Sequence, residues 1–318
     1  MPGPRPAHKR ASPVKLQAAH VRPLLRGDLY CTKGAAMDKV IFETAHLAAL
    51  NDQQRAAVEA VNGPVLLLAV PGSGKTTVLI TRLGYMTEVC GIAPEAILTM
   101  TYTVAATQEM RARFAARFGG ELAARLEFRT INGVAARIIA LYSRMYGRTP
   151  PELIRNESET TPLLMRLWQD TNHEYPAEST VKDLRTAITY IKNMCLTDAE
   201  LDELETDIEN LPDLYRGYQK ALKAAHKMDY DDQLCFALQI LRGAPAVAAA
   251  FRKRSSISAS MSRRIRPRYS MKLSACWRRK AAISLWSATR TRAFTASAPP
   301  TPRRLWTLKR PIPAHRFC

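Results

Sequence analysis

The sequence predicts an α/β fold organised around a glycine-rich loop, with a mostly helical inserted section and basic, disordered ends. Three observations support this prediction. An apolar run at 65–70 precedes the glycine-rich loop, and helical spacing follows it at 78–83. Residues 152–228 show charged helical patterns without a run typical of a strand. The two ends of the chain are strongly basic and lack sustained periodicity.

The loop at 69–77 has the composition of a phosphate-binding loop (P-loop). Gly72 and Gly74 allow backbone N–H groups to turn inward, and the following helix N-terminus adds positive partial charge. Lys75 is placed to reach the β- and γ-phosphates of a nucleotide, and Thr76 offers a hydroxyl to Mg²⁺. A chance Gly/Ser turn is the alternative, which the strand, the Lys-Thr pair and the helix disfavour. The predicted cofactor contacts in the loop are Ala69, Gly72, Ser73, Gly74, Lys75, Thr76 and Thr77.

The formal net charge of +19 is distributed unevenly along the 318 residues. Residues 1–36 carry 7 Lys/Arg and 1 acidic residue, and residues 251–318 carry 18 Lys/Arg and no Asp or Glu. The central residues 37–250 carry 22 Lys/Arg and 27 Asp/Glu, so this part is mildly acidic. Nucleic-acid binding by the central part therefore requires a local groove rather than a general positive field.

The 6 cysteines are scattered, without a CxxC pair or a histidine at metal-ligand spacing. This pattern favours a reduced, intracellular chain without a zinc site. No apolar run reaches the roughly 18 residues of a membrane span, and the N-terminus has no apolar signal core. We therefore expect a cytoplasmic protein without membrane contact.

Residues 1–36 are rich in Pro, Arg, Lys and His. They are either a basic disordered arm that touches nucleic acid or the product of an upstream start, with Met37 as the real first residue. Neither alternative gives this segment a fold.

A capped helix precedes the phosphate-binding loop. Asn51 and Asp52 are expected to cap this helix, which carries Gln54 and continues to about Val58. A glutamine amide at this place can pair with adenine, which offers one donor and one acceptor on its outer edge. The alternative is a capped surface helix without a ligand.

A second buried strand is expected at 96–103. Thr101 and Thr103 at its carboxyl end suit contact with the phosphates of a nucleic-acid strand. Selection of β-branched residues for strand packing explains them nearly as well. A third short strand at 126–131 leads into a helix that begins near Asn132.

Helical spacing dominates the inserted section. Its acid-rich segment 198–209 alternates carboxylates with Leu201, Leu204 and Ile208, which predicts a solvated helix face and no metal site. The helices expected in this section lie at 162–170, 181–194, 197–211 and 214–227.

Together these segments resemble the amino-terminal half of UvrD/Rep/PcrA-like superfamily 1 DNA helicases. The resemblance covers about residues 48–254, and its motifs agree in order and spacing as well as in letters. The matching segments are Leu50 to Arg55 (Q motif), Ala69 to Thr76 (motif I), Thr101 to Arg111 (motif Ia), Thr130 to Gly133 (motif Ib) and Met228 to Leu234 (the D-F-D-D-L segment).

The resemblance implies an incomplete RecA-like P-loop NTPase domain with ATP and Mg²⁺ as cofactors. It implies that Gln54 reads adenine and that Lys75 and Thr76 hold phosphates and Mg²⁺. Single-stranded or partly duplex DNA is the implied partner, and 3′–5′ unwinding is the implied activity of an intact family member.

The DNA contacts implied by the resemblance are Thr101, Thr103 and Asn132. This chain departs from the family pattern beside them, because Val104 and Ala105 stand where an Asn-Lys pair is common. A histidine is usual at the position of Asn132.

The implied organisation divides the chain into consecutive parts. These are 1–36, a basic arm or mis-assigned start; 48–150, the first part of the RecA-like domain; 151–228, the helical insertion; 229–254, the return to that domain; and 255–318, an out-of-frame or disordered basic tail.

The family next requires a strand ending in V-D-E-x-Q-D and then V-G-D-x-D-Q-S-I-Y-G-F-R, and neither is present. No Asp or Glu follows Asp232. Joining the last base of each codon to the next two lets residues 255–266 spell F-Q-Y-I-S-V-D-E-(S or P)-Q-D-T. The same operation lets 285–297 spell M-V-G-D-E-D-Q-S-I-Y-G-F-R. We infer that the reading frame changes near 254/255, which leaves a tail without selected structure and the phosphate-loop strand without neighbours.

These observations predict a fragment of a UvrD-like ATP-dependent DNA helicase that binds nucleotide but is inactive alone. The alternative is a nucleotide-binding module whose basic tail binds nucleic acid. A P-loop kinase is disfavoured, because the glutamine helix and the segments after the second and third strands would then be coincidences.

Overall fold

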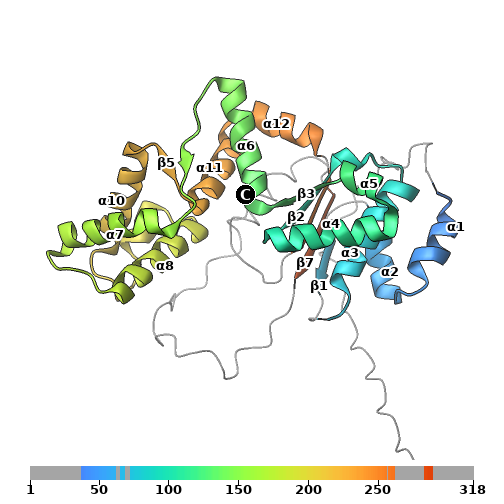
Figure 1. Cartoon of the computed structure of the whole chain (residues 1–318), viewed down its shortest axis with the longest axis horizontal. Coiled ribbons are helices and arrows are strands. Elements are labelled where there is room, and N and C mark those ends of the chain that lie inside the picture. The colour runs from blue at the N-terminus through green and yellow to red at the C-terminus, as the bar shows by residue number, and fades with distance from the viewer. Residues whose placement is uncertain (1–36, 62–64, 69–71, 256, 262–282, 289–318) are drawn as a thin grey trace, which may run out of the picture. The chain divides into compact units, whose positions relative to one another are not determined.

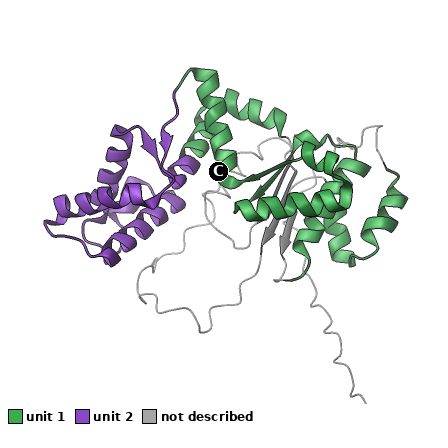
Figure 2. Cartoon of the chain, viewed as in Figure 1, with its two compact units in different colours: residues 1–148, 236–292 green, residues 149–235, 293–318 purple. Residues whose placement is uncertain are grey.

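The computed structural model describes residues 37–61, 65–68, 72–255, 257–261 and 283–288. The chain divides into two compact units (Figure 2). Unit 1 takes the described residues of Met1–Arg148 and Phe236–Arg292, and unit 2 takes Thr149–Cys235. Unit 2 is therefore inserted within unit 1, since the chain leaves unit 1 after Arg148 and returns at Phe236.

A parallel sheet in the order β1-β7-β6-β2-β3 forms the centre of unit 1 (Figure 1). Its register pairs Leu68 with Ala288, Thr99 with Ala259 and Thr101 with Thr130. Because the strands are parallel, their carboxyl ends meet at one edge of the sheet. The strands are β1 (Val65–Leu68), β2 (Ile97–Thr101), β3 (Glu127–Thr130), β6 (Ile257–Met261) and β7 (Ile283–Ala288).

Strands β6 and β7 lie in the part of the chain for which the sequence predicted a tail without structure. They stand between β1 and β2, so β1 and β2 keep hydrogen-bonded neighbours. The expectation that β1 lacks partners is therefore wrong. The physical reason is that short runs of β-forming residues, such as Ile283 to Ala288, satisfy the backbone groups of adjacent parallel strands. The rest of the tail and the arm at 1–36 lie outside the described residues.

Helices cover the sheet of unit 1, and their apolar faces form its core. α2 packs on α3, and α3 packs on α4, which contacts β2 and β3. The helices of this unit are α1 (Lys39–Phe42), η1 (Glu43–Leu47), α2 (Asp52–Glu59), α3 (Lys75–Gly84), η2 (Tyr85–Val89), η3 (Pro94–Ala96), α4 (Val104–Phe118), α5 (Gly120–Arg125), α6 (Ile131–Tyr146) and α12 (Pro245–Arg254). α11 (Tyr230–Gly243) leads from unit 2 into unit 1.

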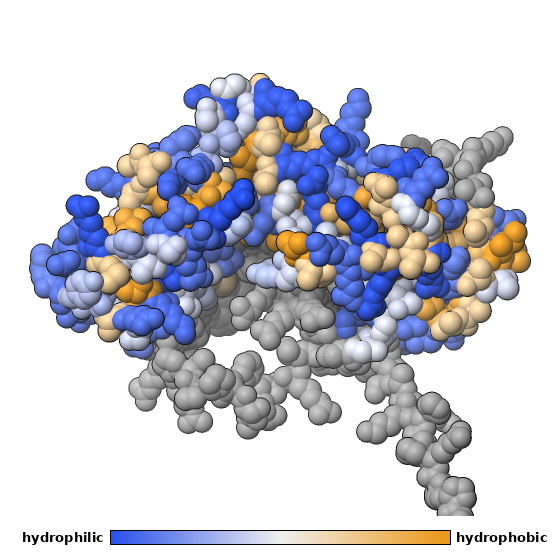
Figure 3. All heavy atoms as spheres, viewed as in Figure 1, coloured by the Kyte–Doolittle hydropathy of each residue, from blue (hydrophilic) through white to orange (hydrophobic). Residues whose placement is uncertain are grey.

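The core of unit 1 begins before the glycine-rich loop. Phe42 and Leu47 are fully buried and belong to the same hydrophobic cluster as Leu79, Phe114 and Phe128. The segment that starts at about residue 37 is therefore an integral part of this unit. On the face shown in Figure 3, apolar side chains are scattered, and one group of them lies over α1, where Val40 and Ile41 are exposed.

Unit 2 is a helical bundle with a two-residue parallel pairing between β4 (Glu152–Leu153) and β5 (Lys227–Met228). Its core includes Trp168, Leu184, Ile188 and Leu214. The remaining helices are α7 (Glu157–Asn172), α8 (Glu178–Met194), α9 (Asp198–Asp202) and α10 (Leu211–Ala224).

The acid-rich segment differs from its prediction. Only Asp198–Asp202 is helical, and the chain then turns until Asn210, which adopts a left-handed conformation with φ 53°. Leu204 and Ile208 still pack against the core of unit 2. The spacing of the leucine and isoleucine residues correctly indicated that they are buried. The segment that buries them after Asp202 is irregular rather than helical.

Candidate nucleotide-binding site

The glycine-rich loop connects the end of β1 to the start of α3. Gly72 and Gly74 have φ of 80° and 78°, values that glycine adopts without strain. α3 begins at Lys75, and its N-cap residue is Gly74, which has no side chain to cap the helix. The positive end of the α3 dipole therefore lies beside Lys75 and Thr76. Ala69 lies outside the described residues, whereas Ser73 and Thr77 flank the turn.

Gln54 joins α2 to this loop. Its Nε2 donates a hydrogen bond of 3.1 Å to the backbone carbonyl of Ser73. Its Oε1 accepts from the backbone N–H of Asn51 at 3.1 Å, while Asn51 Oδ1 accepts from the N–H of Gln54 at 2.9 Å. The predicted capped helix is therefore confirmed as a capping box. The amide expected to face adenine is engaged at both ends in this structure.

Arg82 makes a second connection between α2 and α3. Its side chain is fully buried, and Nη1 donates a 2.6 Å hydrogen bond to the carbonyl of Ala57 near the end of α2. Burial lowers the pKa of Arg82 to about 10. Nε and Nη2 have no hydrogen-bond partner within the structure as described. The loop-bearing helix α3 is thus held to α2 near both ends of α2.

The second threonine group lies where β2 passes into α4. Thr101 is buried, and its hydroxyl bonds to Thr107 and donates to the carbonyl of Thr103 at 3.1 Å. Thr103 caps α4 by accepting from the N–H of Ala106 at 3.1 Å. The hydroxyls predicted to contact nucleic acid therefore organise the start of a helix. Between them, Tyr102 exposes 68 % of its surface, and sequence reasoning overlooked this aromatic ring.

A similar turn follows β3. Thr130 caps α6 by accepting a 3.0 Å hydrogen bond from the N–H of Gly133. Asn132 is half-buried in the first turn of α6, and its Oδ1 lacks a partner among the described groups. Because β2 and β3 are parallel neighbours, the helix starts at Thr103 and Thr130 lie at the same edge of the sheet.

Unit 2 contains a buried ionic network that the sequence did not indicate. The ammonium of Lys192, with no exposed side-chain surface, lies 2.5 Å from Asp229 and 2.8 Å from Asp232. Tyr218 donates a 3.1 Å hydrogen bond to Asp229, and its ring lies 4.9 Å from the ammonium. Burial alone would raise the pKa of Asp229, but the Lys192 charge holds it below its ordinary value.

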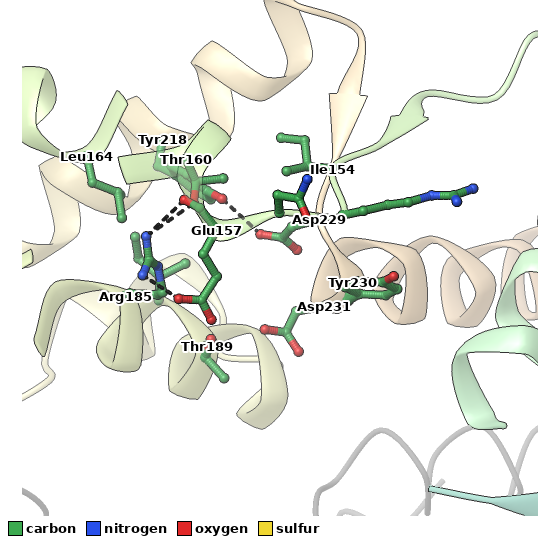
Figure 4. Close-up of a pocket in the computed structure, with 13 residues that line it drawn as sticks. Ile154, Glu157, Thr160, Leu164, Arg185, Thr189, Tyr218, Asp229, Tyr230 and Asp231 are labelled. Atoms are coloured by element: carbon green, nitrogen blue, oxygen red, sulfur yellow. Dashed lines mark hydrogen bonds and ion pairs between the residues drawn. The ribbon is translucent and has the colours of Figure 1, made fainter. Parts of the chain in front are cut away.

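A cavity of about 150 Å³ adjoins this network (Figure 4). Glu157 and Arg185 form an ion pair of 2.7 Å on one side, and Asp229 and Asp231 lie on the other. Burial, and then repulsion by Asp229, raises the pKa of Asp231. Glu157 is largely exposed at the mouth of this cavity, whereas Asp229 is paired with the buried Lys192.

The described residues contain no group of three or more His, Cys, Asp or Glu side chains that could hold a metal ion. Thr76, the residue whose hydroxyl was predicted to bind Mg²⁺, is the second residue of α3 and is half-buried.

No single helix among those described is long and apolar enough to cross a membrane. α11 and α12 pass such a test only as a pair, with a bend of 103° between them.

The parallel sheet, the glycine-rich turn and the helix that starts at Lys75 form a strand-loop-helix junction, an arrangement that suits anionic ligands. The UvrD/REP helicase N-terminal domain family matches residues 50–257, and the chain belongs to this family.

Several relatives share this part of the chain. The ATP-dependent DNA helicase PcrA of Leuconostoc citreum is 29 % identical over 209 residues, which cover 64 % of this chain and 27 % of that protein. UvrD1 of Mycobacterium leprae is 31 % identical over 215 residues, or 65 % of this chain and 27 % of that protein. The helicase srs2 of Schizosaccharomyces pombe is 28 % identical, covering 64 % and 25 %. The chain thus spans about a quarter of the length of these relatives.

Proposed function

We propose that this chain is the nucleotide-binding N-terminal part of a UvrD-like ATP-dependent DNA helicase, built on an incomplete RecA-like P-loop domain. The observation that carries this proposal is the junction of β1, the glycine-rich turn and α3, to which Gln54 is hydrogen-bonded. The relatives named PcrA, UvrD1 and srs2 are ATP-dependent DNA helicases, which supports ATP as the nucleotide.

In the proposed complex, the first-turn N–H groups of α3 and the Lys75 ammonium hold the phosphates, and Thr76 offers its hydroxyl to Mg²⁺. The turn favours glycine at Gly74, because its φ of 78° lies in the left-handed region that other residues adopt with strain. The proposed nucleotide contacts are Gln54, Ala69, Gly72, Ser73, Gly74, Lys75, Thr76 and Thr77. Gln54 uses one N–H and one acceptor site in its present hydrogen bonds, which leaves its second N–H and the second acceptor site of Oε1 for adenine.

DNA is the proposed partner at the adjacent edge of the sheet. Thr101, Thr103 and Asn132 are the candidate contacts, because they lie at the helix starts that follow β2 and β3. Helix N-termini and hydroxyls suit phosphates. The exposed ring of Tyr102 suits stacking on a base of a single strand. Translocation with 3′–5′ polarity is proposed only for the intact helicase.

We propose that this chain alone does not turn over ATP. No acidic residue follows Asp232, so the strands after the insertion cannot supply the carboxylates that hold Mg²⁺ and orient water. The matched part of the chain spans 27 % of the length of the PcrA of Leuconostoc citreum. Phosphate binding and phosphoryl transfer are thus separated in this fragment.

The test uses the full chain with fluorescent ATP and a DNA-stimulated ATPase assay. We expect saturable nucleotide binding, a loss of at least about tenfold in affinity in Lys75→Ala, and no turnover. Lys39→Ala, which removes an exposed cation elsewhere in unit 1, is the matched control. Absence of binding would overturn the proposed site, and turnover that disappears in Lys75→Ala would overturn the proposed inactivity.

The cause of the missing motifs has a separate test. Sequencing the gene around codons 254 and 255 is expected to show that a one-base correction opens a long frame encoding both motifs. An unchanged frame in independent reads would mean that the tail is genuine.

A genuine tail supports the second candidate, a nucleotide-binding module with a nucleic-acid-binding tail. Two observations favour it: residues 251–318 carry 18 Lys/Arg without an acidic residue, and β6 and β7 take part in the sheet. This candidate requires DNA affinity that falls steeply with salt and decreases when residues 289–318 are removed. Affinity that is indifferent to that deletion would exclude it.

A further inference from the structure

The strands of the sheet in unit 1 determine which carboxylates could bind Mg²⁺ beside the glycine-rich loop. In P-loop enzymes the ion is held by the Ser/Thr of the loop, by phosphate oxygens and by a carboxylate of a second motif. Thr76 supplies the hydroxyl of such a set. The carboxylate must come from a segment that reaches the same edge of the sheet.

The strands beside β1 offer no such group. β7 reads Ile-Ser-Leu-Trp-Ser-Ala and β6 reads Ile-Ser-Ala-Ser-Met, so neither contains Asp or Glu. β7 pairs in parallel with β1 and with β6, so Ala288 and Met261 lie at the edge of the sheet where the loop begins. No acidic residue occurs anywhere after Asp232, so the segments that follow these strands cannot supply one either.

The groups that bind phosphate remain in place. The glycine turn has φ values of 80° and 78° and α3 begins at Lys75, and a glycine turn before a helix N-terminus attracts phosphate without a metal ligand. β1 is the edge strand of the described sheet and pairs with β7, so the strand before the loop keeps a hydrogen-bonded neighbour. Unit 1 therefore retains its anion-binding groups but lacks an expected part of the metal-binding set, and the residues do not fit a tightly held Mg²⁺.

We propose that nucleotide binding by this chain is independent of Mg²⁺, because the tail strands that complete the sheet replace the carboxylate-bearing segments. The proposal rests on the proposed nucleotide site. On this proposal the protein is a phosphate-binding module. The affinity for ATP is similar with and without Mg²⁺, and the same holds for ADP.

The experiment titrates the full chain with fluorescent ATP and ADP, first with millimolar Mg²⁺ and then with EDTA. We expect the two affinities to agree within about threefold for each nucleotide. A loss of more than about tenfold in EDTA would overturn the proposal. Failure of the nucleotide site itself has another signature, namely no binding in either condition or equal binding in Lys75→Ala.

A gain-of-function variant tests the assignment of the missing ligand. Met261 is the last residue of β6, and the regrouped codons place an Asp across Ser260 and Met261. Met261→Asp is expected to create Mg²⁺ dependence of at least about fivefold, whereas the uncharged control Met261→Asn leaves the affinities equal. Equal affinities with and without Mg²⁺ in Met261→Asp would overturn the assignment of the missing ligand to this strand.

Discussion

Gln54 shows how one side chain can serve two structural purposes next to the glycine-rich loop. Its amide oxygen completes the capping box of α2, and its amide nitrogen holds the carbonyl of Ser73. The two bonds can be separated by substitution, because glutamate keeps an acceptor for the capping box but cannot donate to the carbonyl.

Gln54→Ala is expected to lower the free energy of unfolding by about 1 kcal/mol and to weaken nucleotide binding. Gln54→Glu is expected to keep the capping box but to lose the stability contributed by the bond to Ser73, and to weaken binding, since its negative charge repels the phosphates of a nucleotide. Thermal unfolding and fluorescent-nucleotide titration measure the two effects, with the exposed neighbour in Gln53→Ala as control. Equal affinities in Gln54→Glu and the unmodified chain would contradict the role of this contact.

Asp231 lowers the free energy of unfolding by an amount that depends on pH. Burial and the nearby Asp229 raise its pKa above the ordinary value of 3.8, so its charged form is disfavoured in the folded state. A raised acid pKa costs stability at neutral pH, and the cost disappears as pH falls below the unfolded value.

Asp231→Asn is therefore expected to raise the melting temperature at pH 7, with a gain that shrinks towards zero below about pH 4. Asp183→Asn, an exposed aspartate on α8, controls for the loss of one charge. Melting curves across this pH range are the measurement. A gain that is constant with pH would contradict the titration of Asp231 as its cause.

At the scale of elements, single buried cations connect helices that are separate in the sequence. Arg82 of α3 bonds to the end of α2, and Lys192 of α8 bonds to the aspartates at the start of α11. A buried cation beside carboxylates does not guarantee stability, but removing it leaves buried charges uncompensated. These contacts therefore fix how the helices are placed.

Lys192→Met is expected to destabilise unit 2 by about 3–5 kcal/mol, because Asp229 and Asp232 lose their cation. Hydrogen exchange over α8, α10 and α11 measures this loss. Lys182→Met removes an exposed lysine from the same helix and is expected to leave exchange unchanged. Unaltered protection in Lys192→Met would show that the network contributes nothing to stability.

At the scale of the whole molecule, the sheet depends on strands from the end of the chain. β6 and β7 separate β1 from β2, so their removal leaves two strands without their inner neighbours. Unit 2 has its own core and no strand in that sheet. The two units are thus expected to respond differently to truncation.

A chain ending at Arg254 is expected to lose hydrogen-exchange protection in β1 and β2 while the helices of unit 2 keep theirs. A chain ending at Arg292 retains both tail strands and is expected to behave as the full protein. Preserved protection of β2 in the shorter chain would mean that the tail strands do not support the sheet.

The sequence by itself determined the features that depend on local chemistry. The glycine pair before Lys75, the Asn51 cap and the helical spacing of the insertion each follow from residues close together in the chain. The acid-rich segment was predicted less well, because Leu204 and Ile208 satisfy their burial without a helix.

Only the tertiary structure decided the pairings between distant residues. It placed β6 and β7 between β1 and β2, turned Gln54 towards Ser73, and buried Lys192 between Asp229 and Asp232. The spacing of residues along the chain does not predict such contacts. They form because backbone groups in a sheet must be hydrogen-bonded and because a buried charge must be paired, and both requirements depend on the three-dimensional structure. The glycine-rich loop and the strand before it could thus be found from sequence, while the tail strands β6 and β7 could not.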